Sequence, residues 1–84
     1  MKLFHRIGPG GEDSALVRTA LVDKGLADDV EFCNIAFETH LRDLRATTGG
    51  EVVPVLLPDD GRPPVIGKDA ILAEINHSFG NGSR

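Results

Sequence analysis

The chain has 84 residues, which is enough for one small domain with a single core. A net charge of −4 and only four aromatic residues, all phenylalanine, argue against nucleic acid as a partner, because phosphate binding needs positive charge and base stacking needs aromatic rings. No apolar run has the length of a signal peptide or of a membrane span, so we expect a cytoplasmic protein without membrane association.

The single cysteine, Cys33, cannot form an internal disulfide bond, so the fold does not depend on an oxidising compartment. Cys33 follows Phe32 in a predicted strand, where a free cysteine is most simply a small buried hydrophobe. An exposed Cys33 would instead be a site for a mixed disulfide. His5, His40 and His77 lack the spacing of metal ligands, and we assign no metal site.

The N-terminal part of the chain reads as a strand followed by a helix. Polar and apolar residues alternate over residues 2–7, which predicts a strand. A glycine-rich loop follows, and Asp13 or Ser14 can cap a helix that runs to Lys24. A glycine directly after Lys24 supplies the stop.

A second strand and a second helix follow. Residues 30–35 predict the strand, and residues after it recur at helical spacing. The residues that share one face of this helix are Phe37, Leu41, Leu44 and Thr48. Gly49 and Gly50 end the helix. Two strands joined by a helix imply a right-handed parallel unit.

A proline opens the next apolar stretch. Pro54 lacks a backbone N–H, so it belongs at the first residue of a strand or at a special peptide bond. This predicts a third strand over residues 55–57. An X-Pro bond is the one kind that adopts the cis form at a cost of only about 0.5–1 kcal/mol. We expect the Val53–Pro54 bond to be cis.

The C-terminal part predicts a hairpin and a last helix. Residues 59–61, Asp-Asp-Gly, are a turn signal before a short strand over residues 64–66. Gly67 then opens a helix. Its apolar residues, which we expect to face the sheet, are Ile71, Leu72, Ile75 and Phe79. We expect residues 80–84 to be a flexible tail, so the domain spans residues 1–79.

Three segments in this βαβαββα order carry a family resemblance. Residues 14–26 read Ser-Ala-Leu-Val-Arg-Thr-Ala-Leu-Val-Asp-Lys-Gly-Leu, residues 48–54 read Thr-Gly-Gly-Glu-Val-Val-Pro, and residues 66–71 read Ile-Gly-Lys-Asp-Ala-Ile. The first resembles the first helix of glutathione transferases, the second resembles a glutaredoxin segment, and the third lies where both families open their last helix. The resemblance covers residues 1–79 and implies a thioredoxin-like, glutaredoxin-type fold, a four-stranded mixed sheet flanked by three helices.

The resemblance places the glutaredoxin Cys-x-x-Cys motif at residues 11–14, which read Gly-Glu-Asp-Ser here. The nucleophilic cysteine is therefore replaced by Gly11. Disulfide exchange requires a thiolate, which a glycine cannot supply. Some transferases use a serine or cysteine near this position, and others use a tyrosine, which this chain lacks. Ser14 is the remaining candidate for a catalytic hydroxyl, but we favour a capping role for it.

Glu12 and Asp13 bring two carboxylates to the start of the first helix. Each stabilises the first turn by about 0.3–1 kcal/mol, and both would compete with an anionic ligand for the helix dipole. Two adjacent carboxylates alone are not an acid–base pair. We expect a structural role for both.

The resemblance implies that two elements of a glutathione site are retained. In the family, the backbone of the residue before the cis proline pairs with the cysteinyl part of glutathione as an added strand would, which assigns this role to Val53, next to Pro54. The family holds the γ-glutamyl end at the start of the last helix. There, Gly67, Lys68 and Asp69 offer backbone N–H groups, a cation and a carboxylate.

Two alignments of this last segment remain open. The transferase pattern puts Gly67 and Lys68 at the positions of its acidic residue and serine, whereas the glutaredoxin pattern keeps Asp69 as its aspartate. The structural alternative is that Asp69 caps the helix and that Lys68 is a solvated surface residue.

Arginines add positive charge to the chain. Arg6 lies in the first predicted strand, and Arg42 and Arg45 share a face of the second helix. Glu38 lies four residues before Arg42 and can pair with it. We therefore interpret Arg42 and Arg45 as part of a solvated helix face rather than a binding site.

Three functions remain as alternatives. The one that we favour is a redox-inactive module that binds glutathione, a related small thiol or an extended peptide beside Val53–Pro54, with no cofactor required. Its expected ligand-binding residues are Gly11, Val53, Pro54, Gly67, Lys68 and Asp69. The second is a minimal transferase or glutaredoxin-like enzyme that uses Ser14. The third is an interaction or assembly module that pairs through an exposed sheet edge or the hairpin at residues 58–64.

Overall fold

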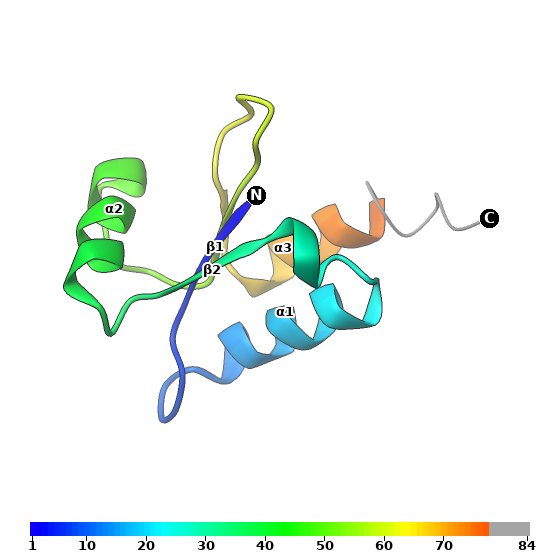
Figure 1. The fold of residues 1–84 in the computed structure, drawn as a ribbon, viewed down its shortest axis with the longest axis horizontal. Coiled ribbons are helices and arrows are strands. Elements are labelled where there is room, and N and C mark those ends of the chain that lie inside the picture. The colour runs from blue at the N-terminus through cyan, green and yellow to red at the C-terminus, as the bar shows by residue number, and fades with distance from the viewer. Residues whose placement is uncertain (78–84) are drawn as a thin grey trace.

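The computed structural model describes residues 1–77, and Figure 1 shows its fold. The elements in chain order are β1 (Lys2–His5), α1 (Glu12–Asp23), a short 3-10 helix (Ala27–Asp29), β2 (Glu31–Asn34), α2 (Glu38–Thr48), β3 (Val55–Leu57), β4 (Val65–Ile66) and α3 (Lys68–Ile75). The predictions for Phe79 and for a tail over residues 80–84 lie outside the described residues. Among the helices of the described part, none has the length and apolar character needed to cross a bilayer.

The strands form one mixed sheet in the order β2-β1-β3-β4. β1 and β2 are parallel, with Leu3 opposite Phe32, and β3 runs antiparallel to β1, with Leu56 also opposite Leu3. β3 and β4 form the predicted antiparallel hairpin. The four-stranded mixed sheet with three flanking helices, expected from the sequence, is therefore confirmed.

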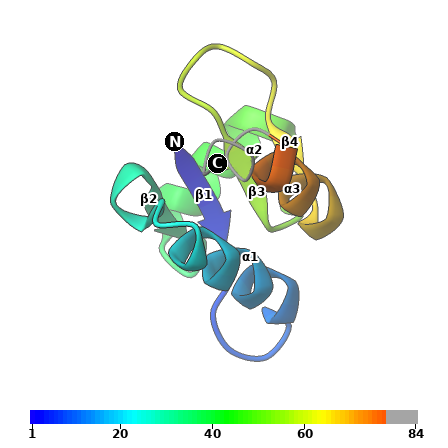
Figure 2. The same ribbon diagram turned by 90° about the vertical axis from the view of Figure 1, so that its right-hand side faces the viewer.

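Helices cover both faces of the sheet (Figure 1). α2 lies on one face, and α1 and α3 lie side by side on the other, as Figure 2 also shows. Successive side chains of a strand point to opposite faces. Leu3 accordingly packs with α1 and α3, whereas its neighbour Phe4 packs with α2. The alternation in β1 thus divides the core into two layers.

Each layer has its own buried cluster. On the side of α1 and α3 the buried residues are Leu3, Val17, Leu21, Val30, Leu56, Ile71 and Ile75. On the side of α2 they are Phe4, Cys33, Ile35, Leu44 and Val55. Burial of a large apolar side chain contributes about 1.5–3 kcal/mol, so these clusters hold the helices on the sheet.

The three α-helices begin at the same edge of the sheet. β1 and β2 are parallel to each other. β3 is antiparallel to β1, and β4 is antiparallel to β3, so β4 runs in the same direction as β1. The strands β1, β2 and β4 therefore all end at one edge. Each of these strands leads into a helix, and β3 begins at the same edge. In open α/β sheets, ligands commonly bind beyond the carboxyl ends of the strands. We call this the helix-start edge.

The structure differs from the prediction at the end of β1 and at the start of α2. β1 ends at His5 rather than at Ile7, because the chain turns away into the loop, and Ile7 is 59% exposed. Phe37 precedes α2 and is 64% exposed, so the prediction that it belongs to this helix and shares a face with Leu41 and Leu44 is wrong. α2 ends as predicted at Gly49, whose φ of +79° suits glycine.

Candidate functional site

Val53 and Pro54 enter β3 at the helix-start edge. The peptide bond between them is cis, Pro54 is buried and Val53 is half-buried. The ladder between β1 and β3 ends where Phe4 lies opposite Val55, so Val53 is just beyond the paired residues. Within residues 1–77, the backbone N–H and C=O of Val53 make no hydrogen bond to another backbone group. Such groups must bind water or a ligand.

Gly67 connects Pro54 to the start of α3. The Gly67 N–H donates to the carbonyl oxygen of Pro54 at 2.9 Å, and the Gly67 carbonyl accepts from the N–H of Ile71 at 3.0 Å. Its φ of +95° and ψ of 154° are adopted readily only by glycine. The Gly67 N–H is thus occupied within the fold. The N–H groups of Lys68 and Asp69, in the first helical turn, have no partner inside the helix.

Lys68 and Asp69 form an exposed charged pair at this helix start. The Lys68 ammonium lies 3.6 Å from a carboxylate oxygen of Asp69, and the side chains are 32% and 94% exposed. Gly67 is the residue at the N-cap of α3, and no side chain caps the helix. The alternative that Asp69 is the helix cap is therefore wrong. The predicted site residues that lie together at the β3 and α3 starts are Val53, Pro54, Gly67, Lys68 and Asp69.

Gly11, the position of the missing nucleophile, is the buried N-cap residue of α1. A Cβ atom built on Gly11 would lie 2.4 Å from the carbonyl oxygen of Arg6, a backbone atom that cannot simply rotate away. The Gly11 N–H donates to the carbonyl of Gly8 at 2.9 Å. The loop is closed so tightly that position 11 has room only for glycine, and its N–H is not free for a ligand.

Ser14 does not cap α1, contrary to the prediction. It lies inside the first turn and is 1% exposed, and its hydroxyl oxygen accepts a hydrogen bond from the backbone N–H of Arg6 at 3.1 Å. Asp13 does not cap either, since α1 begins after Gly11 with no side-chain cap. The Ser14 hydroxyl is therefore committed to the loop that follows β1, and it faces no ligand surface.

The remaining charged residues of α1 and α2 considered in the sequence analysis are exposed. Glu12 and Asp13 lie in the first turn of α1, as predicted, where they suit the positive end of the helix dipole. On α2, Arg45 pairs with Glu51, Nε to Oε2 at 2.7 Å. Within the described residues, Arg42 makes no ion pair, so the predicted Glu38–Arg42 pair is not formed.

Cys33 is buried in the α2 layer, as predicted, and is 1% exposed. Its Sγ lies 3.7 Å from the carbonyl oxygen of Glu31, and burial, followed by the Glu31 carboxylate, raises the pKa of the thiol. A buried thiol with a raised pKa is a poor nucleophile. Within residues 1–77, no three His, Cys, Asp or Glu side chains lie close enough to hold a metal ion.

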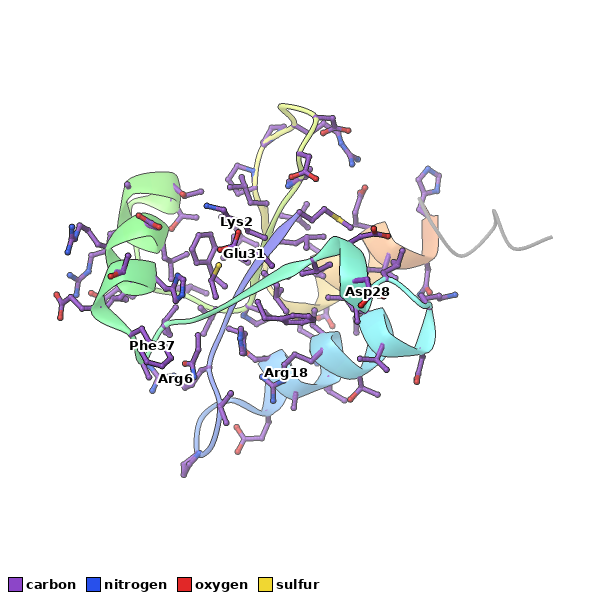
Figure 3. The ribbon with its side chains drawn as sticks, viewed as in Figure 1. Lys2, Arg6, Arg18, Asp28, Glu31 and Phe37 are labelled. Atoms are coloured by element: carbon purple, nitrogen blue, oxygen red, sulfur yellow. The ribbon has the colours of Figure 1, made fainter. Side chains whose placement is uncertain are left out.

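A feature that the sequence reasoning missed is a groove of about 450 Å³ between α1 and β2. We call it the Arg18 groove; its lining residues are His5, Arg18, Thr19, Val22 and Phe32. Arg18, labelled in Figure 3, donates from Nη1 to Nδ1 of His5 at 3.0 Å and to the carbonyl oxygen of Arg6 at 3.1 Å. The sequence signal that could have indicated the groove is the alternation in β1, because it puts His5 on the same face of the sheet as Leu3.

His5 is the buried partner of Arg18. Burial, followed by the charge of Arg18 and then of His40, lowers the pKa of His5 below its ordinary value of 6.5. An arginine can only donate, so Nδ1 of His5 accepts and Nε2 carries the proton. The imidazole and the ring of Phe32 form a T-shaped contact, with centroids 5.9 Å apart and an interplanar angle of 88°. His5 is therefore held neutral and in one tautomer.

Three large apolar side chains are exposed on segments that leave or enter the sheet at the helix-start edge. Ile7 follows β1 and is 59% exposed, Phe37 follows β2 and is 64% exposed, and Val52 precedes β3 and is 63% exposed. Phe37 also meets the ring of His40 edge-on, with centroids 6.2 Å apart. We call these three residues the apolar rim.

The chain resembles a solved structure in both fold and sequence. The match is a glutathione S-transferase domain-containing protein from Marinobacter aquaeolei VT8, with a TM-score of 0.69 and 32% sequence identity. It covers 94% of this chain and 38% of the solved chain. No family model matches the chain, and no curated protein matches it.

The sheet order, the flanking helices and this match agree with one another. The chain therefore has the thioredoxin-like fold of a glutathione transferase N-terminal domain, and it spans about two fifths of the longer protein that it matches.

Proposed function

We propose that this chain is a binding domain that holds glutathione, a related small thiol or an extended peptide beside Val53–Pro54, without thiol chemistry of its own. The observation that carries the proposal is the backbone of Val53. Its N–H and C=O lie directly beyond the β1–β3 ladder and have no backbone partner within residues 1–77. An extended ligand would pair with both groups, as an added strand does.

The start of α3 would hold the charged end of such a ligand. The free N–H groups of the first helical turn favour a carboxylate, and the Lys68 ammonium adds a positive charge beside them. The Asp69 carboxylate, 94% exposed, would accept from an ammonium group. The α-carboxylate and α-ammonium groups of a γ-glutamyl residue match this pair of charges.

Three residues argue against thiol chemistry in this domain. Gly11 has no side chain and no space for one, the thiol of Cys33 is buried with a raised pKa, and the hydroxyl of Ser14 is buried and hydrogen-bonded to Arg6. Cys33 and Ser14 are each only 1% exposed, so neither presents a reactive group to a ligand at the surface. These positions support binding over the alternative of a minimal transferase or a glutaredoxin-like enzyme.

The apolar rim supports an extended peptide as a second candidate ligand. Ile7, Phe37 and Val52 are exposed beside the helix-start edge, and burial of exposed apolar side chains favours association. The carboxylates of Glu12 and Asp13 disfavour an anion at α1, so a negatively charged end is directed towards Lys68 instead. The likeness to a glutathione S-transferase domain-containing protein supports glutathione as the first ligand to test.

The proposal is tested by measuring the affinity for reduced glutathione and for S-methylglutathione by calorimetry. Because the ligand is recognised by backbone groups and not through its thiol, we expect both to bind within about threefold of each other. The Val53→Ala variant keeps the backbone N–H and should bind within about threefold of the wild type. The Val53→Pro variant lacks this N–H and should lose about tenfold.

A peptide of five apolar residues with blocked ends, offered in competition, distinguishes the second candidate. Displacement of glutathione by this peptide would indicate a shared site at Val53. Equal glutathione affinity of the Val53→Ala and Val53→Pro variants, with the fold of both verified by amide NMR spectra, would contradict the proposal. A molecular mass in solution that increases with protein concentration would instead favour the alternative of an assembly module.

A further inference from the structure

We propose that the Arg18 groove is a second binding site, which takes a small carboxylate bearing an aromatic or aliphatic group, with its carboxylate on Arg18. The groove lies between α1 and the edge strand β2, whereas the site proposed above lies at the starts of β3 and α3. The two proposals rest on different residues, so each can fail without the other.

The charge of Arg18 is not matched by a carboxylate. Within residues 1–77 the ion pairs of arginine involve Arg45 and Arg62, and Arg18 has none. Among the residues that the structure describes, no acidic residue lines the groove, although the chain as a whole carries a net charge of −4. A groove with one uncompensated cation in an acidic protein favours an anionic ligand.

The guanidinium of Arg18 is held in position with donors to spare. Its contacts to Nδ1 of His5 and to the carbonyl of Arg6 both use Nη1. His5 is itself buried and packs against Phe32, so these two contacts hold Nη1 in a defined place. Within residues 1–77 the Nε–H and Nη2–H groups have no partner, so they remain for a carboxylate, which matches the bidentate geometry of arginine.

The other walls of the groove select the rest of the ligand. Val22 is 59% exposed and Phe32 is half-buried, so both present apolar surface, and Thr19 adds an exposed hydroxyl. The volume of about 450 Å³ falls in the range of small-molecule sites. A single cation beside apolar walls suits a monocarboxylate with a ring or a short chain better than a doubly charged phosphate.

The test is an NMR titration of ¹⁵N-labelled protein with benzoate, and with benzamide as the neutral analogue. We expect saturable benzoate shifts at the amides of Arg18, Thr19 and Phe32. Benzamide should bind about tenfold more weakly, because it lacks the charge that pairs with Arg18. Absence of benzoate shifts at these amides, or equal affinity for both probes, overturns the proposal.

Two variants remove the ion pair by different routes. Arg18→Gln removes the cation. Val22→Glu places a carboxylate four residues along the helix, where it would pair with the Arg18 guanidinium and make it unavailable to benzoate. Both variants should bind benzoate about tenfold more weakly than the wild type. Val22 is exposed, so Val22→Glu decides the question if Arg18→Gln fails to fold. Arg42→Gln, on the helix layer at the opposite face of the sheet, is the matched control. If Val22→Glu binds benzoate with the affinity of this control, the proposal is overturned.

Discussion

The buried hydroxyl of Ser14 accepts a hydrogen bond from the backbone N–H of Arg6 at 3.1 Å, which ties the first turn of α1 to the loop that leaves β1. The same loop is closed by the contact of Gly11 with Gly8 and by the donation from Arg18 to the Arg6 carbonyl. The region that would hold a catalytic thiol in a glutaredoxin is therefore a closed structural unit.

Removal of the Ser14 hydroxyl should destabilise the fold. In Ser14→Ala the N–H of Arg6 loses its hydrogen-bond partner, which costs about 1 kcal/mol in the free energy of unfolding. Urea denaturation measures this change. Thr19→Ala, an exposed substitution on the same helix, is the control and should change stability by less than about 0.5 kcal/mol. Equal stability of the two variants would show that the Ser14 contact contributes nothing.

A side chain at position 11 should be poorly tolerated. In Gly11→Ala the added Cβ would lie 2.4 Å from the Arg6 carbonyl oxygen, so the loop must shift at a cost of about 1–3 kcal/mol. Gly50→Ala is the matched control, because nothing lies within 4 Å of a Cβ there. Gly11→Cys should likewise be destabilised and should reduce no disulfide substrate above background. A Gly11→Ala variant as stable as Gly50→Ala would refute this account of the loop.

Cys33 should react slowly with thiol reagents in the native protein. The thiol is 1% exposed and its pKa is raised by burial, so the reactive thiolate is scarce and shielded. Reaction with an aromatic disulfide reagent, followed by absorbance, should be at least about a hundredfold slower in buffer than in denaturing urea, because opening of the fold must come first. Similar rates in the two conditions would place the thiol at the surface.

The stability of the protein should depend on the titration of His5. The pKa of His5 is lower in the folded protein than its ordinary value of 6.5, so between these two values the unfolded chain binds more protons. The free energy of unfolding should therefore decrease as the pH falls below 6.5, and the contribution should be complete above that value. Urea denaturation at a series of pH values measures this slope.

The His5→Gln variant isolates this effect. It removes the titrating group, so its stability should vary less with pH in this range than that of the wild type, whatever its absolute stability. Val52→Ala, at a residue that is 63% exposed, removes no titrating group and should keep the slope of the wild type. An unchanged slope in His5→Gln would assign the pH dependence to other groups.

Much of the fold could be predicted because its signals are local. The bounds of β3 and the glycine ends of the helices follow from proline, glycine and apolar spacing, which act within a few residues. The role of Ser14 could not be predicted in this way. A serine near a helix start usually caps it, but here the loop geometry puts Gly11 at the cap and turns the hydroxyl towards Arg6.

The candidate site was predictable only in part, for a related reason. Val53 and Gly67 were found from their sequence context, and the structure joins their segments through the Gly67–Pro54 hydrogen bond. The Arg18 groove depends on how α1 packs over His5 and Phe32, which are distant in sequence. The exposure of Phe37 likewise follows from the start of α2 at Glu38, a boundary that periodicity alone does not fix.

The most direct test of the central claim is a titration of ¹⁵N-labelled protein with reduced glutathione, followed by backbone amide NMR. We predict saturable shifts at Val53, Lys68 and Asp69 at millimolar ligand, with Arg18 and Thr19 unaffected. Shifts confined to other segments, or no shifts at all, would contradict a retained glutathione site at the start of β3.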